Sequence, residues 1–146
     1  MTLKELNRAV CERVKKAVQA AGIQAELIAE DVSAPIVRPS VKVELEDGTD
    51  AALSHRMSEQ SVTFRIYFFA RDPYRPKLDN LAMREALSDV FRAGVETAEG
   101  MVPADEGLSF AVADGVLTAS LSLLLEQEEP ETEEDMENMN LNWEGS

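Results

Sequence analysis

The chain has 146 residues, with 14 Lys and Arg against 28 Asp and Glu and a formal net charge of -14. This length supports one hydrophobic core rather than two, and the excess of carboxylates opposes non-specific binding to nucleic acid, which depends on cations that neutralise phosphates. The first twenty residues contain no continuous apolar run, so we expect no signal peptide, no membrane span and a cytoplasmic protein.

The charge is unevenly distributed along the chain. Nine of the 28 acidic residues lie from Glu126 onward, where no Lys or Arg occurs, so residues 1–125 carry 19 acids against 14 bases and a net charge of −5. The single cysteine, Cys11, and the single histidine, His55, have no neighbours at the spacing of metal ligands. We therefore expect no disulfide, no metal site and no cofactor.

A helix is predicted at the N-terminus. Thr2 and Glu5 form a capping box, in which each side chain can bond the backbone amide of the other residue. Gly22 is placed to end the helix in a left-handed conformation. Between them, one apolar stripe repeats at three- and four-residue steps: Leu3, Leu6, Val10, Val14, Ala17 and Ala21.

Three strand candidates follow. Residues 24–29 form a short one, and residues 40–46 alternate strictly between apolar and charged side chains, as in a half-buried strand. From Asp47 to about His55 the chain is polar, and we expect a connection that projects from the domain. Residues 60–70 are the strongest strand candidate, with Val62, Phe64, Ile66 and Phe68 on one face.

The second face of that strand is also apolar at its C-terminal end. It carries Arg65, Tyr67 and Phe69, whereas a strand in a one-sided sheet should show water a polar face. Tyr67 and Phe69 therefore need cover, either from the same chain or from a neighbouring subunit.

Two more elements complete the chain. After a proline-rich turn at residues 72–76, an amphipathic pattern predicts a helix over residues 77–98. Residues 107–113 and 116–126 then form a hairpin, because Asp114-Gly115 suits the positive φ angles of a type I′ turn. The order α-β-β-β-α-β-β predicts an α+β fold, an antiparallel or mixed sheet of four to five strands with two helices on one face.

The C-terminal region differs in composition. We expect one domain over residues 1–126, followed at 127–146 by a flexible acidic linker and an apolar arm, since charge density without apolar content does not support folding. The arm contains Met136, Met139, Leu141 and Trp143, the only tryptophan. It could dock on a partner, dock on its own sheet or stay disordered.

No catalytic motif is present. The chain lacks a nucleophile elbow, a phosphate-binding loop, a dinucleotide-binding glycine pattern and a zinc-protease helix. Its carboxylate pairs, such as Glu44 with Glu46, sit at alternate, solvated strand positions, whereas acid–base catalysis needs carboxylates in shielded sites. We expect a protein that is not an enzyme.

The serial order of several segments resembles the phage tail-terminator-like family. The similarity rests on the N-terminal helix, the second helix and these further segments: Glu30-Asp31-Val32, Val41-Lys42-Val43, Arg56 ahead of the strand Val62 to Phe68, Asp114-Gly115-Val116-Leu117, and an acidic stretch leading to Met136-Glu137-Asn138-Met139. The resemblance covers most of the chain. It rests on order, since none of these segments is specific alone.

The resemblance implies a tail-terminator subunit of the virion tail. Such a subunit assembles as a ring, usually hexameric, at the head-proximal end of the tail tube, where it contacts tube and head–tail connector proteins. It implies no catalytic residues and no specific nucleic-acid contact. As candidate interface residues we take Arg56, Arg65, Tyr67, Phe69, Met139, Leu141 and Trp143.

Two other functional classes remain open from sequence. A DNA mimic would use ordered carboxylates in place of phosphates, and a small enzyme of unfamiliar type would enclose buried carboxylates in a deep pocket. The clustering of acid after Glu126 disfavours the first of these.

Overall fold

The computed structural model describes residues 2–28, 37–52 and 57–128. In chain order its elements are α1 (Leu3–Ala21), β1 (Glu26–Ile28), β2 (Ser40–Ala52), β3 (Met57–Phe69), α2 (Lys77–Phe91), β4 (Val95–Thr97), β5 (Gly100–Val102), β6 (Ala104–Ala113) and β7 (Val116–Glu128). This succession contains the predicted order α-β-β-β-α-β-β, with β4 and β5 inserted as an additional small hairpin.

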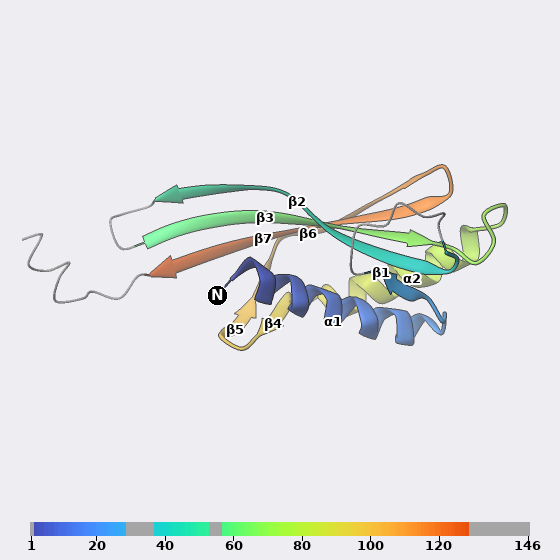
Figure 1. Ribbon diagram of the computed structural model, residues 1–146, viewed down its shortest axis with the longest axis horizontal. Coiled ribbons are helices and arrows are strands. Elements are labelled where there is room, and N and C mark those ends of the chain that lie inside the picture. The colour runs from blue at the N-terminus through green and yellow to red at the C-terminus, as the bar shows by residue number, and fades with distance from the viewer. Residues whose placement is uncertain (1, 29–36, 53–56, 129–146) are drawn as a thin grey trace, which may run out of the picture.

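The described elements form two layers. One is a sheet with the strand order β1-β2-β3-β7-β6, in which β1 runs parallel to β2 and the other neighbours are antiparallel. Figure 1 shows the other layer, α1 and α2 together with the β4–β5 hairpin, on one side of the sheet. The predicted α+β class, with two helices on one face of a mixed five-stranded sheet, is confirmed.

The N-terminal helix begins and ends where its capping residues predict. The Thr2 hydroxyl accepts a hydrogen bond from the Glu5 amide at 3.1 Å, and the Glu5 carboxylate accepts one from the Thr2 amide at 3.3 Å. Gly22 follows the helix with φ 71°. Leu6, Val10, Val14 and Ala17 are fully buried in the core, so the middle of the predicted stripe is confirmed, whereas its first member, Leu3, is 39% exposed.

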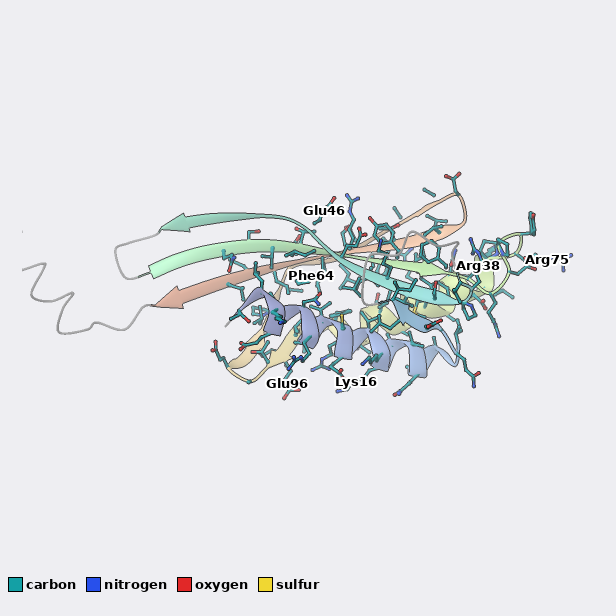
Figure 2. The ribbon with its side chains drawn as sticks, viewed as in Figure 1. Lys16, Arg38, Glu46, Phe64, Arg75 and Glu96 are labelled. Carbon is teal, nitrogen blue, oxygen red and sulfur yellow. The ribbon has the colours of Figure 1, made fainter. Side chains whose placement is uncertain are left out.

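Strand β3 lies at the centre of the core. Its neighbours β2 and β7 pair with it from Met57 to Phe69, so its inward side chains are covered from both sides and by the helices. Val62, Phe64, Ile66 and Phe68 are at most 2% exposed. Figure 2 shows Phe64 pointing from the sheet toward the helix layer.

The predicted β6–β7 hairpin is confirmed. Asp114 and Gly115 have φ angles of 52° and 78°, as a type I′ turn requires. Strand β7 buries Leu117, Ala119, Leu121, Leu123 and Leu125 on the helix side of the sheet, as the alternation predicted.

The structure of the polar segment after residue 46 differs from the prediction. We expected a connection from Asp47 to about His55, but β2 continues to Ala52 and pairs with β3 through Ala52 and Ser58. The pairing advances three residues from Leu45 to Gly48 while β3 advances two, so a β-bulge absorbs one residue. His55 lies outside the described residues.

The second helix is shorter than predicted. It ends at Phe91 rather than near Ala98, and residues 95–102 form the β4–β5 hairpin. The reason is Gly94, whose φ of 101° no helix accommodates. A Cβ at this position would collide with the Val102 carbonyl oxygen and lie 2.8 Å from the Cα of Pro103, so two backbone segments meet here.

Three strands continue beyond the helix layer. The residue pairs from Gly48–Val62 to Ala52–Ser58, with β7 alongside as far as Glu128, form a three-stranded extension that we call the β-arm. Figure 1 shows it running past the start of α1 and past the β4–β5 hairpin. The β-arm takes the place of the projecting loop expected from sequence.

The start of α2 is fixed to the end of β3 by one ion pair. The Arg71 guanidinium donates to both carboxylate oxygens of Asp79, at 2.7 and 3.0 Å, and the Arg71 amide donates to Asp79 at 3.2 Å. These hydrogen bonds lower the pKa of Asp79. Asp79 also places a negative charge in the first turn of α2, where it interacts favourably with the positive end of the helix dipole.

We predict that Asp79→Asn lowers the free energy of unfolding by about 1 kcal/mol at neutral pH. Because the pKa of Asp79 is lowered in the folded state, its stabilisation is present above the unfolded pKa and lost as pH falls through the folded one. The difference between variant and parent should therefore shrink below about pH 4. Urea denaturation at pH 7 and pH 3 measures this, with the exposed Glu85→Gln as control; a difference that is independent of pH contradicts it.

We also predict that Gly94→Ala costs more than about 2 kcal/mol of stability, because the new Cβ meets backbone atoms that cannot move aside. Gly22→Ala is the matched control, since Gly22 has φ 71° but no atom within 4 Å of the added Cβ. The control should cost about 1 kcal/mol from backbone strain alone. Equal losses of stability in the two variants, measured by thermal denaturation, would show that the close approach at Gly94 is unimportant.

Candidate subunit interface

The face of the sheet opposite the helices carries the residues predicted to lie at an interface. On β3, Arg65, Tyr67 and Phe69 alternate with the buried core residues and are half-buried. Their register neighbours on β2 are Ser40 for Phe69, Lys42 for Tyr67 and Glu44 for Arg65. No described helix covers this face, which we call the outer face.

Phe69 is partly covered by a cation. The Arg38 guanidinium lies 5.8 Å from the centre of the Phe69 ring and donates a hydrogen bond of 3.2 Å to the Ala70 carbonyl oxygen. A guanidinium stacked on an aromatic ring keeps its donors at the ring edges, where they can bind a further carboxylate or carbonyl. Figure 2 places Arg38 at the end of the sheet opposite the β-arm.

Arg65 occupies the middle of the outer face. A hydrogen bond with Tyr67 and the charge of Glu46, which is 2.8 Å away, raise the pKa of its guanidinium. Its buried Nε atom has no hydrogen-bond partner among the described residues. Lys42 and Glu44 form a second ion pair at 2.6 Å on β2. The middle of the face is therefore charged but internally balanced.

Toward the β-arm the outer face becomes a surface of hydroxyl groups. The Thr63 and Ser122 side chains hydrogen-bond at 3.1 Å across β3 and β7. Ser120 and Ser109 are paired in register next to Arg65 on β7 and β6. The aromatic side chains Tyr67 and Phe69 therefore lie at one end of the outer face. Hydroxyl side chains such as Thr63 lie between them and the β-arm.

Only part of the predicted interface can be placed. Arg65, Tyr67 and Phe69 come together on the outer face, as their alternation along one strand predicts. Arg56, Met139, Leu141 and Trp143 lie outside the described residues.

Sequence reasoning missed a second apolar surface, on the helix side. A groove of about 300 Å³ runs between α2 and the edge strand β6. We call it the α2–β6 groove; its walls include Lys77, Leu81, Arg84, Phe110, Val112 and Leu117. Leu81 is 52% exposed and Val112 60% exposed. The available signal was that Leu78 and Leu81 fall outside the apolar stripe of the second helix.

Within the described ranges no three His, Cys, Asp or Glu side chains are grouped so that they could hold a metal ion. Burial raises the pKa of the Cys11 thiol, which disfavours the reactive thiolate. A further groove of about 330 Å³ between α1 and the β4–β5 turn is lined by both signs of charge, including Arg13 and Glu96, which pair at 3.4 Å. None of the described helices is both long and apolar enough to cross a bilayer.

Comparison with known proteins identifies a matching family and a solved structure of similar fold. A family model described as phage tail terminator protein matches residues 5–136. A chain in the solved virion of a native gene transfer agent particle is similar in fold, with a TM-score of 0.54 and 18% sequence identity. That alignment covers 86% of this chain and 96% of the virion chain. A search of curated proteins gave no match.

The outer face yields a direct test. We predict that replacing both Tyr67 and Phe69 by Ser lowers the mass of the assembled protein, because the apolar end of the face loses the area that would be buried against a neighbour. Light scattering after size-exclusion chromatography measures the mass, and circular dichroism checks the fold. Met101→Ser, which removes a 48% exposed apolar side chain from the helix side, is the control. Unchanged assembly in the double variant contradicts the assignment.

Proposed function

Because this chain belongs to the phage tail terminator family, we propose that it is a structural subunit that caps the tail tube and joins it to the head connector. In this proposal the active form is a closed ring, with six copies as the expected number, in the tail of the virion. The observation that carries the proposal is the family match over residues 5–136, which spans the whole described sheet, all of α2 and α1 from Glu5 onward.

The surfaces of the described domain support an assembly role. The outer face offers half-buried aromatics beside an ion-pair network, and the β-arm extends beyond the helix layer. A subunit that must contact copies of itself and different proteins above and below needs several distinct surfaces. A closed ring can form when one patch on each copy binds a second, different patch on the next copy.

The charge of the chain supports a position around a DNA channel. Residues 1–125 carry a net charge of −5 and the whole chain −14. A ring lined by carboxylates repels the phosphate backbone, so DNA can pass through it without binding. The family and the excess of carboxylates therefore both support a ring through which DNA passes without being bound.

The outer face argues against a DNA mimic. Its acidic residues Glu44 and Glu46 are paired with Lys42 and Arg65 at 2.6 and 2.8 Å. A mimic of the phosphate backbone needs unbalanced carboxylates in a rigid row, whereas these charges cancel one another. We therefore prefer the structural role.

The capping role predicts an effect on tube length. When tail-tube subunits assemble in the presence of the purified chain, the mean tube length should fall as the ratio of chain to tube subunit rises, because capped ends stop growing. Negative-stain electron microscopy measures the lengths and shows extra density at one end of each tube. The Tyr67→Ser, Phe69→Ser double variant should leave tubes long. Tubes of unchanged length in excess folded protein refute the capping role.

A further inference from the structure

The α2–β6 groove is an exposed apolar surface on the helix side of the sheet, opposite the outer face. Leu81 from α2 and Val112 from β6 face it while more than half exposed, and Leu78, one turn before Leu81, is 78% exposed. Patches of this kind on a small soluble protein mark contact sites. A groove of about 300 Å³ is at the lower end of the sizes of small-molecule sites, which leaves room for one large side chain.

The charge of the groove is opposite to that of most of the chain. Lys77 and Arg84 line it, no acidic residue does, and the Arg84 guanidinium lies 4.9 Å from the centre of the Phe110 ring in its wall. Asp79, next in sequence to the lining residue Asn80, is held by Arg71 at 2.7 Å. The groove therefore suits an occupant that combines a large apolar group with negative charge.

One segment of this chain has that composition. Residues 129–137 contain six acidic residues and no Lys or Arg. Four apolar residues lie at the end of this stretch or just after it: Met136, Met139, Leu141 and Trp143. Trp143 is the only tryptophan of the chain and the largest apolar side chain available. Tryptophan is the residue that most often contributes the dominant contact at a protein interface.

The geometry of β7 favours docking between copies. Leu117, in the groove wall, is near the start of β7, and Glu128 is its last residue, so they lie about 36 Å apart along the strand. Figure 1 shows β7 running from the α2 end of the molecule to the tip of the β-arm. A chain of fifteen residues, as from Glu128 to Trp143, spans at most about 50 Å when fully extended, so reaching its own groove would use up most of that length. Its own groove is thus at the wrong end of the domain.

We propose that the C-terminal segment, residues 136–143, of one copy binds in the α2–β6 groove of the next copy, with Trp143 as its main contact. This rests on the proposed ring and deepens it. Strand β7, the last described element before the segment, ends at the tip of the β-arm, and the groove lies at the other end of the domain, so the proposed contact is head-to-tail. Contacts of that type close into rings when the rotation between copies permits.

A peptide of residues 126–146 tests the contact without assembly. It is added to full-length Trp143→Ser protein, which has no tryptophan, so all indole emission comes from the peptide. We expect a saturable shift of the emission to shorter wavelength, weakening as salt rises. Leu81→Glu in the same protein should weaken binding about 30-fold, since it adds repulsion and removes apolar contact. Leu45→Glu, at a 43% exposed position outside the groove, should bind as the parent does.

The native chain distinguishes binding between copies from binding within one. Its Trp143 emission should shift to shorter wavelength as concentration rises and the chain assembles. The Leu81→Glu chain alone should show no shift, yet its emission should shift when Trp143→Ser protein, whose groove is intact, is added. A shift that is already complete in dilute monomers, no saturable binding of the peptide, or equal binding by the Leu81→Glu protein each overturns the proposal.

These outcomes separate the contact from the capping role. If the peptide binds the groove but the native chain leaves tube length unchanged, the capping role fails and the contact stands. If the chain shortens tubes while the peptide does not bind, the contact fails and the capping role stands.

Discussion

The strict two-residue alternation of β3 is the constraint on which the rest of the fold depends. Its inward side chains, from Val62 to Phe68, are buried beneath the helices, and a slip of one residue would place Arg65 and Tyr67 in the core. Both neighbouring strands pair with β3 along most of its length, so their registers follow from it. The same alternation forces Arg65, Tyr67 and Phe69 onto the outer face, so core and candidate interface share one cause.

Elements with a local physical cause could be predicted from sequence. The capping box at Thr2, the left-handed Gly22 and the Asp114-Gly115 turn depend on residues adjacent in the chain, and all three are present. The continuation of β2 to Ala52 could not be predicted, since Asp47 and Gly48 are typical turn residues and only pairing with β3 makes them strand. The early end of α2 depends on the contact of Gly94 with the backbone after β5.

Only the part of the candidate interface that lies on one strand, β3, could be predicted from sequence. Alternation placed Arg65, Tyr67 and Phe69 together, but the contacts that surround them come from other segments. Arg38 lies over Phe69, and Glu46 reaches Arg65 from β2. The α2–β6 groove combines a helix with a strand twenty or more residues away in sequence, so no periodicity within either element reveals it. Its sequence signal was limited to leucines on the wrong face of α2.

The chain belongs to the phage tail terminator family and presents several distinct surfaces for contact. The outer face, the β-arm and the α2–β6 groove lie on different sides or ends of one small domain, and no three His, Cys, Asp or Glu side chains of the described residues are grouped to hold a metal ion. Electron cryomicroscopy of tails purified from cells that produce the particle tests this most directly. The account predicts a closed ring of this chain at the head-proximal end of the tube, with successive copies in head-to-tail contact. Tails that lack the chain, or that carry it as isolated copies without mutual contact, would contradict it.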